Sequence, residues 1–311
     1  MKLSNTALKM RADARKVSWS ENTERAYERQ FNWFRDWCEA NNTPSMPAEP
    51  NAIINYLAEL VAQGKSLSYV KIARNAIRGY HKLHHAGPNP IKDPAIAEYL
   101  ESAYATAEKE PRGQALPLRQ QEVDFICDYL EAEVHEAKTW LQRDRALRKI
   151  ALLRVGADAA LRRGELIALT WADVTFPRNG SKEMTTVRIV RSKTSDDPAT
   201  LPVGKKAADA LRAVYDFGAW EDTDLVFRLK TGHAVTMWIR KVTLTAGLIP
   251  PMGRNFSGHS LRMGRAIELA ERGGTTLEVG AMLRHRDASM AEHYSKAAMG
   301  SLILRKYFAE D

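Results

Sequence analysis

Cysteine is scarce in this chain of 311 residues, which contains only Cys38 and Cys127. The two lie far apart and lack the spacing of metal ligands, so the sequence argues against a disulfide framework and against a zinc site. No apolar run reaches the roughly 18 residues that a membrane span requires, and residues 1–20 lack the apolar centre of a secretory signal. We therefore expect a cytoplasmic protein with no membrane contact and no metal.

The chain has more basic than acidic side chains. Lys and Arg total 46 against 38 Asp and Glu, which gives a net charge of +8 and a pI of about 9.4. Residues 1–110 and the remainder are each basic, so the excess is not confined to one part of the chain. This balance favours nucleic acid or another polyanion as partner, although many basic proteins bind neither.

The length and the distribution of proline and glycine predict two domains. Residues 108–118, EKEPRGQALPL, combine two prolines, a glycine and charges, as is typical of a linker. We expect a flexible arm over residues 1–18, an all-α domain over residues 19–107, and a second domain over residues 119–311. The second domain is predicted to be mostly α with a small antiparallel sheet.

Short β-type runs in the second domain predict that sheet. The segment TTVRIVRSKTSDDPATLPV, residues 185–203, alternates apolar and polar side chains on both sides of a polar turn, which indicates two strands. DLVFR, residues 224–228, indicates a further short strand. The Arg-rich segment that ends in LRRGEL and most of the chain after residue 228 indicate helices.

Two helices predicted in the first domain differ in their side chains, since one is rich in aromatic residues and the other carries a row of cations. In residues 20–42, Ser20 is a candidate N-cap and the aromatic side chains, Trp33 and Trp37 included, are interpreted as core and not as a base-stacking platform. The helix of residues 66–85 carries an apolar stripe and, opposite it, a row of cations with no acid. This row suits contact with a DNA backbone or major groove, the alternative being a solvated basic face. The candidate DNA-binding residues are Lys71, Arg74, Arg78 and Lys82.

The sequence HSLR places an imidazole and a guanidinium on one face of a helix. His259 and Arg262 are three residues apart and follow the turn-like NFSG, so they are expected in the first helical turn. Free N–H groups at a helix N-terminus attract anions, and these two side chains would add to a phosphate or carboxylate site. Taken alone, the pair is also compatible with a structural role.

Several motifs occur together in one order along the chain. LRRGEL at residues 161–166 is followed by SKTSD in the strand turn, GHSLRMGRAIELAERGG at residues 258–274, LRH, and EHYSK. From about residue 115 to the end, this series resembles the tyrosine recombinases, also termed the phage integrase family. The first half of the chain is similar to the core-binding domain of the Cre-type subgroup, and GHSLRMGRAIELAERG looks most like that subgroup too. The resemblance implies a C-shaped clamp around DNA.

The resemblance implies a role for each matching residue. Arg162, selected over Arg163 by the pattern Leu-Arg-x-x-Glu-Leu, would clamp the scissile phosphate together with Arg262. Planar, permanently charged guanidinium groups suit this because charge builds up on the phosphate oxygens in the transition state. Glu165 would support Arg162 or a neighbouring histidine, the alternative being a surface ion pair.

The remaining roles concern proton transfer and attack. Tyr294 would be the nucleophile, with Tyr307 as a rival that we interpret as packing. His259 would exchange a proton with the nucleophile, and His285 would donate to a non-bridging oxygen; Cre itself has tryptophan at that place. Lys193 would protonate the departing 5′ oxygen. Its nearby rivals are Lys182, Lys205 and Lys206.

The implied function is site-specific DNA recombination through a 3′-phosphotyrosine and a Holliday junction, with no ATP, metal or cofactor. The implied partners are double-stranded DNA with a palindromic target site and three further copies of the chain, a homotetramer on two DNA sites. A C-terminal helix over residues 299–308 would pack onto the next subunit, the alternative being its own domain. The setting would be the nucleoid of a prokaryote or a phage-infected cell. A catalytically silent DNA-binding protein and a type IB topoisomerase are the alternatives.

Overall fold

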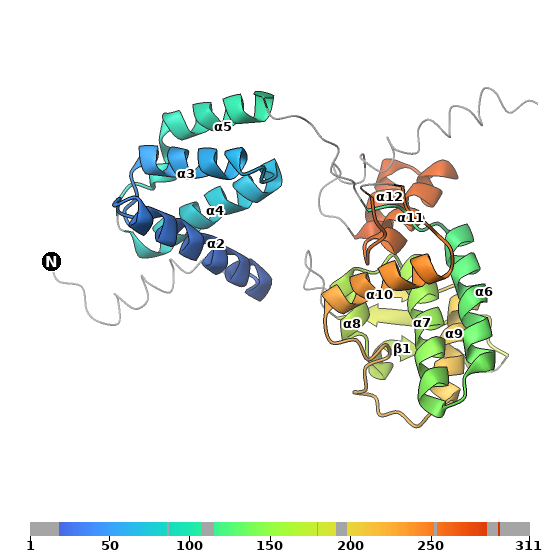
Figure 1. Cartoon of the computed structure of the whole chain (residues 1–311). Helices are drawn as coiled ribbons and strands as arrows, with labels where there is room; N and C mark the ends of the chain where they lie inside the picture. The colour runs from blue at the N-terminus through green and yellow to red at the C-terminus, as the bar shows by residue number, and fades with distance from the viewer. Residues whose placement is uncertain are drawn as a thin grey trace, which may run out of the picture. The chain divides into compact units, whose positions relative to one another are not determined.

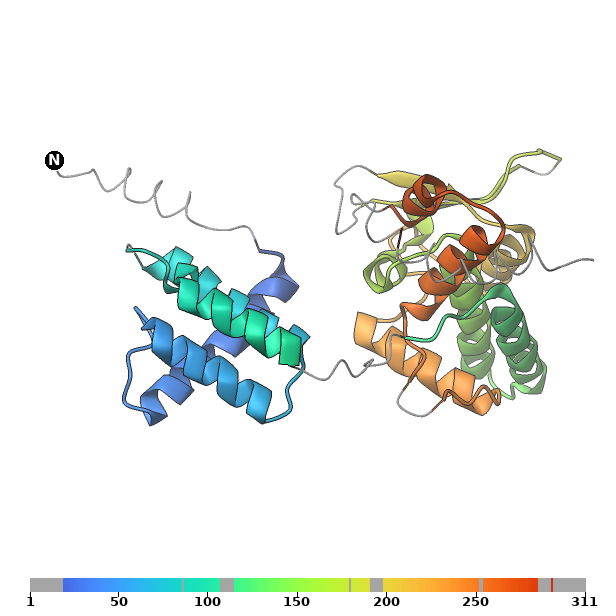
Figure 2. The ribbon, with the colours of Figure 1, turned by 90° about the horizontal axis from the view of Figure 1, so that it is seen from above.

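The structure is a computed structural model that describes residues 19–85, 87–106, 115–178, 180–190, 198–251, 254–284 and 292. The chain divides into two compact units, residues 1–110 and residues 111–311, drawn in Figures 1 and 2. No helix within the described ranges is long and apolar enough to cross a membrane. The predicted arm, most of the predicted linker and the predicted helix of residues 299–308 lie outside these ranges.

The N-terminal unit is helical throughout its described part. It contains α2 (Glu21–Ala40), α3 (Pro50–Ala62), α4 (Leu67–His84), the 3-10 helix η1 (Pro90–Lys92) and α5 (Pro94–Thr106). The predicted N-cap is confirmed, since the Ser20 side chain accepts a hydrogen bond from the backbone N–H of Thr23 at 3.4 Å. The apolar faces of α2 and α4 meet, and Phe31 stacks on Tyr80 with ring centroids 4.2 Å apart.

One prediction about this unit is wrong. Trp33 is not core, because 44% of its surface is exposed and Arg29 lies over its ring at 5.5 Å. Trp37 is half-buried, and its indole N–H donates to Glu59 at 2.5 Å. The buried face of α2 is therefore narrower than the aromatic content of the sequence indicates, and it is centred on Phe34.

The C-terminal unit is mostly helical with a small sheet, as predicted. Its elements in order are α6 (Gln120–Glu136), α7 (Trp140–Asp158), α8 (Arg163–Ala168), η2 (Trp171–Asp173), β1 (Val174–Thr175), β2 (Thr186–Ile189), β3 (Ala199–Pro202), α9 (Lys205–Asp216), α10 (Gly232–Thr245), α11 (Ser260–Glu271) and α12 (Thr276–Leu283). The strands form one antiparallel sheet in the order β1-β2-β3. Val187 pairs with Val174 on one side and with Leu201 on the other.

The segment DLVFR does not form the predicted strand. Its backbone pairs with the loop before η2, where the N–H of Val226 donates to the Leu169 carbonyl at 2.9 Å. This pairing is a single bridge between Thr170 and Leu225 and does not extend the sheet. The apolar side chains Val226 and Phe227 are nevertheless buried in the core, which explains the strand-like sequence.

Helix α7 is the centre of the C-terminal unit. It packs against α6 and α9 and also contacts α11. Helix α12 packs on α11, beside which it lies in Figure 1. Leu152, Leu153 and Val155 of α7 are almost fully buried, so its apolar residues face several neighbours at once. This central position brings the end of α7, the start of α8 and the start of α11 to one place.

Gly264 lets the chain cross α11 closely. A Cβ atom built at this residue would lie 1.8 Å from the Leu118 carbonyl oxygen, which no real side chain tolerates. The backbone N–H of Leu118 donates to the Ser260 carbonyl at 3.0 Å, so the segment before α6 is bonded to the first turn of α11. The glycine thereby fixes the helix that carries His259 and Arg262 against the rest of the unit.

Candidate active site

Arg162 stands at the start of α8, directly after the turn that ends α7. The sequence alone predicted this motif at the end of a helix, whereas the structure places it at the N-terminus of the next one. The side chain of Glu165 accepts from the Arg162 backbone N–H at 2.8 Å and from its guanidinium, also at 2.8 Å. Of the two adjacent arginines, Arg163 turns away to the hydroxyl of Thr236 at 3.1 Å. The two side chains therefore have separate partners.

The first turn of α11 brings Arg262 to the same place. Its guanidinium donates to the Ala160 carbonyl at 2.7 Å and to the Leu283 carbonyl, and the residue is only 1% exposed. The Arg162 guanidinium reaches the same Leu283 carbonyl at 3.5 Å. Two arginines that are 100 positions apart in the sequence thus share an acceptor, as the phosphate clamp requires of its two halves.

The C-terminal end of α12 completes the described part of the site. Arg284 ends this helix in a left-handed conformation, with φ 51° and ψ 47°. Its guanidinium donates to Glu165 at 2.7 Å and to the Ala159 carbonyl at 3.1 Å. No role for Arg284 follows from the sequence motifs. The available signal was an arginine, in place of the usual glycine, directly after the apolar helix TLEVGAML.

Glu165 is the carboxylate on which these arginines converge. Its side chain is 3% exposed, and burial alone would raise its pKa. The Arg162 N–H and the guanidinium groups of Arg284 and Arg162 outweigh burial, so the pKa of Glu165 lies below its ordinary value. The open alternative of a surface ion pair is excluded, because the carboxylate is inside the protein.

His259 lies at the N-terminus of α11 and keeps an exposed surface. Desolvation by the protein around it lowers the pKa of His259, and the positive charges of Arg262, Arg163 and Arg162 lower it further. Because the ordinary histidine pKa is 6.5, the lowered value leaves the imidazole neutral at pH 7. A neutral imidazole can accept a proton from a nucleophile.

Three of the predicted catalytic residues, Lys193, His285 and Tyr294, lie outside the described residues, as does the rival Tyr307. The rival lysines are described. Lys205 pairs with Asp209 at 2.7 Å and Lys206 with Asp124 at 3.0 Å, while Lys182 is exposed. Both pairs lie at the surface, with 87% of the Lys205 side chain and 67% of the Lys206 side chain exposed, so they exclude neither lysine. Lys193 stays the prediction for the proton donor, with Lys182, Lys205 and Lys206 as its alternatives.

The cationic row of α4 is only partly at the surface. Lys71, Arg78 and Lys82 are exposed, whereas Arg74 is half-buried. The Lys71 ammonium lies 4.8 Å from the centre of the Tyr104 ring of α5. These residues belong to the N-terminal unit, and their role in DNA contact stays a prediction.

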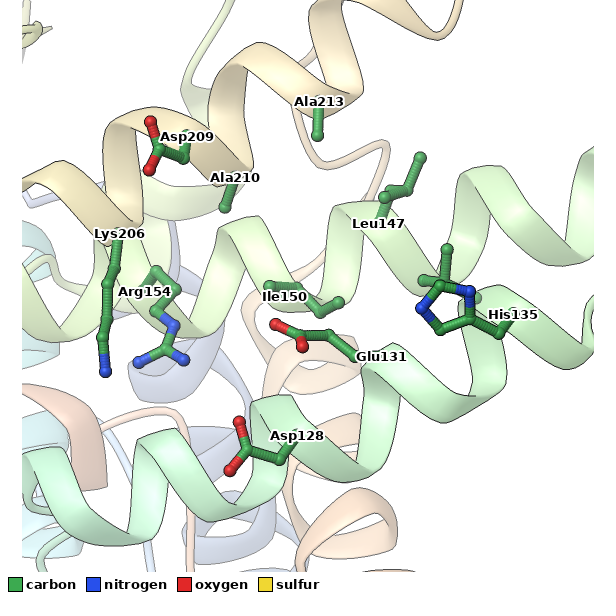
Figure 3. A pocket seen from close by; sticks show the side chains of 11 residues that line it. Asp128, Glu131, His135, Leu147, Ile150, Arg154, Lys206, Asp209, Ala210 and Ala213 are labelled. Atoms are coloured by element: carbon green, nitrogen blue, oxygen red, sulfur yellow. The ribbon is translucent and has the colours of Figure 1, made fainter.

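A cavity of about 420 Å³ lies elsewhere, between α6, α7 and α9 (Figure 3). The carboxylates of Asp128, Glu131 and Asp209 line it together with Arg154 and Lys206. It contains none of the predicted catalytic residues, and its acidic lining is unsuited to a phosphate backbone. The cluster around Arg162 is therefore the candidate active site. No group of acidic, histidine and cysteine side chains that could hold a metal ion occurs among the described residues.

Comparison with known families decides the identity of the chain. Residues 117–300, more than half of the chain, match the family model described as the phage integrase family. The chain belongs to the phage integrase family. Of the predicted sites, Arg162, Lys193, His259, Arg262, His285 and Tyr294 all fall within the matched residues.

Relatives extend this likeness over nearly the whole chain. An integrase/recombinase xerD homolog of Selenomonas ruminantium is 25% identical over 315 residues, which cover 93% of this chain and 86% of the relative. Tyrosine recombinase XerD of Brucella melitensis is 25% identical over 283 residues and covers 89% of this chain and 87% of its own length. This phage integrase family member is thus a tyrosine-type site-specific recombinase.

Solved structures of low sequence identity share the fold. The Tn1549 transposon integrase in complex with transposon right end DNA has a TM-score of 0.61 at 13% identity and covers 94% of this chain and 97% of its own. A lambda integrase dimer bound to a COC' core site has a TM-score of 0.59 at 17% identity, with 95% of each chain covered. The predicted fold class is confirmed, whereas membership in the Cre-type subgroup stays a prediction.

Proposed function

We propose that this recombinase cuts and rejoins duplex DNA through Tyr294. The phenol oxygen attacks a backbone phosphorus, the bond to the 5′ oxygen breaks, and a 3′-phosphotyrosine and a free 5′ hydroxyl result. The energy of the phosphodiester is kept in the new ester, so a 5′ hydroxyl from a second duplex can attack it without ATP or metal. Two such exchanges would pass through a Holliday junction.

The observation that carries this proposal is the meeting of Arg162 and Arg262 at the Leu283 carbonyl. Charge builds up on the non-bridging oxygens as a fifth oxygen approaches phosphorus, and fixed guanidinium groups stabilise that charge. The chain then runs from Leu283 through Arg284 to His285 and on to Tyr294, so the proposed nucleophile follows Leu283 by eleven positions in the sequence.

The proposed proton transfers and hydrogen bonds involve His259, Lys193 and His285. A neutral His259 accepts the phenol proton as attack begins, which the lowered pKa of this histidine allows at pH 7. Lys193 donates a proton to the departing 5′ oxygen, and His285 donates a hydrogen bond to a non-bridging oxygen. The same groups act in the opposite direction when the 5′ hydroxyl attacks.

Arg262 cannot bind a phosphate in the conformation described, because it is 1% exposed and bonded to two carbonyls. Its engagement requires that the turn at Leu283 move or that a phosphate oxygen replace this carbonyl. Arg162 is more accessible, with 19% of its side chain exposed. We propose that DNA binding at the site replaces the carbonyl contacts by phosphate contacts.

DNA binding and assembly complete the proposal. The net charge of +8 and the exposed cations of α4 support contact with double-stranded DNA that carries a palindromic target site. We propose a homotetramer on two DNA sites, with residues 299–308 packing on the next subunit. The lambda integrase structure of the comparison contains a dimer on a core site, so the number of subunits must also be measured.

The test captures the covalent intermediate. End-labelled fragments of the genomic DNA that flanks the gene are incubated with wild-type protein, and complexes that resist SDS are isolated and sequenced. Recurrent capture at one inverted repeat, with the protein joined to a 3′ phosphate, is expected. Capture of every fragment alike would favour a topoisomerase, and binding without capture would favour a silent DNA-binding protein. Either of these results contradicts the proposal.

A further inference from the structure

Arg284 lies at a position where an arginine side chain is unfavourable. The residue that ends a helix in the left-handed conformation is commonly glycine, because a Cβ atom makes this conformation unfavourable. Arg284 nevertheless adopts φ 51° at the end of α12. Its side chain is 12% exposed, so a guanidinium is also buried at this strained position. The left-handed backbone and the burial of a charge each cost stability, which indicates that the Arg284 side chain has a function.

Several hydrogen bonds of Arg284 reach the turn before Arg162, in addition to one to the Met282 carbonyl of its own helix at 3.3 Å. Its guanidinium donates to the carbonyls of Ala159 and Ala160 at 3.1 and 3.4 Å, and these residues form the turn between α7 and α8. It also donates to Glu165 Oε2 at 2.7 Å. Arg284 thus ties the end of α12 to the base of α8.

Glu165 relays this contact to Arg162. One carboxylate oxygen, Oε1, binds the Arg162 guanidinium at 2.8 Å, and the other, Oε2, binds both the Arg284 guanidinium and the Arg162 backbone N–H. The Arg284 carbonyl accepts from the Arg162 guanidinium at 3.1 Å. Arg162 is therefore oriented by Arg284 in two ways, through the shared carboxylate and through the backbone.

We infer that Arg284 is a positioning residue for strand cleavage, which it supports by holding Glu165 and, through it, the guanidinium of Arg162. The inference rests on the proposed function and adds a residue to which the sequence assigned no part. In this proposal Arg284 acts on cleavage through Glu165 and Arg162 and not by contact with the scissile phosphate. Without its side chain, Glu165 loses one of its two charged partners among the described residues, and the Arg162 guanidinium gains freedom to leave the attack geometry.

The test measures the rate of covalent capture on the genomic fragment that the wild-type protein captures. The protein concentration is high enough to saturate the DNA. The R284M variant keeps a long apolar stem and loses the charge, and a misplacement of order 1 Å can slow a reaction by about 100-fold. We expect a loss of about that size, with the dissociation constant for DNA unchanged within about threefold. R284K keeps the charge but not the forked geometry, so partial rescue is expected.

Two comparisons separate positioning from a general loss of structure. R284G relieves the left-handed backbone and should be as slow as R284M, because the side chain and not the backbone is at issue. In an R162A background, R284M should slow capture by no more than about twofold, since the residue on which Arg284 acts is gone. R148M is the matched control, because Arg148 is also a buried arginine, with 6% of its side chain exposed against 12% for Arg284, and it is bonded to Asp144 at 2.9 Å. It should lower the melting temperature but leave the rate below melting within about threefold.

The outcomes are distinct. Capture by R284M within threefold of wild type, or an equal slowing by R284M with and without Arg162, overturns the inference and leaves the proposed function intact. Failure of the wild-type protein to capture any fragment overturns the proposed function, and the inference with it. If R284M melts below the assay temperature, R284G and R284K provide the same comparison.

Discussion

The two units of this recombinase treat charge differently. Among the described residues, every buried Arg, Asp or Glu lies in the C-terminal unit: Asp144, Arg148, Arg154, Glu165, Asp173 and Arg262. The buried polar residues of the N-terminal unit are Gln30 and His81, and its cations lie at or near the surface. Surface cations suit a phosphate contact that salt screens, whereas buried cations are held in place for a single geometry.

Two different arrangements of arginine within the C-terminal unit sharpen this contrast. Arg148 is matched one to one with Asp144, whose two carboxylate oxygens both lie 2.9 Å from its Nε atom. At the candidate site, the carboxylate of Glu165 binds both Arg162 and Arg284, and Arg262 lies beside them on backbone carbonyls. A matched pair holds the fold together, whereas clustered guanidinium groups are suited to receive an anion.

The largest expected effect belongs to the nucleophile. Y294F removes the attacking oxygen and should abolish covalent capture while DNA binding by gel shift stays within about twofold of wild type. Y307F is the control and should capture DNA at close to the wild-type rate. Covalent capture by the Y294F protein would contradict the assignment.

Loss of either clamp arginine should be the next largest effect. R162A or R262A removes a fixed cation from the transition state, for which a slowing of about 1000-fold is expected in single-turnover capture. R148M removes a buried arginine from a matched pair and should reduce stability more than rate. A similar slowing by all three variants would mean that burial, and not position, sets the effect.

The sequence predicted the parts of the fold that have a clear apolar period, and it singled out Arg162 and Arg262, which the structure brings to one carbonyl. The helices around Phe34 and Ile77 follow from their apolar stripes, and the turn position of His259 and Arg262 follows from NFSG. The exposure of Trp33 did not follow, because an exposed tryptophan beside Arg29 has the same sequence pattern as a core residue.

Contacts between residues far apart along the chain could not be predicted from the sequence either. DLVFR pairs with a loop at residue 169 in place of a strand, and only the tertiary structure determines that choice. The link between Glu165 and Arg284 joins residues 119 positions apart. No local period or spacing predicts such a pair.

Gly264 provides a test of how α11 is held. G264A places a methyl group against the Leu118 carbonyl, 1.8 Å from the built Cβ atom, and overpacking of this kind costs about 1–3 kcal/mol of unfolding free energy. Urea unfolding measures the loss. At Gly164 of α8 a Cβ atom would have no neighbour within 4 Å, so G164A should leave stability unchanged or slightly higher. Equal stabilities for G264A and wild type would contradict the close crossing at this glycine.

The surface cations of the N-terminal unit should have smaller and more uniform effects. K71A, R78A and K82A each remove one exposed charge, for which a loss of a few fold in DNA affinity is expected, together with a weaker dependence on salt. Gel shifts at two salt concentrations measure both. K205A, which removes a lysine paired with Asp209, is the control. Affinities unchanged by all three α4 variants would exclude this face from the DNA contact.

Acid stability gives the smallest effect. The folded pKa of Glu165 lies below its ordinary value of 4.5, so the carboxylate contributes stability that is complete above pH 4.5 and is lost as pH falls through the lower, folded value. E165Q lacks this contribution. The difference in unfolding free energy between wild type and E165Q should therefore shrink as pH falls below 4.5, and a constant difference would contradict the buried network.

The most direct test of the central claim replaces the charge on which the arginines are proposed to act. Wild type and R262A are compared on two copies of the captured DNA site, one with the natural scissile phosphate and one with a neutral methylphosphonate there. The account predicts a slowing of about 1000-fold by R262A on the phosphate and of less than about tenfold on the neutral group. The same large slowing on both substrates would contradict it.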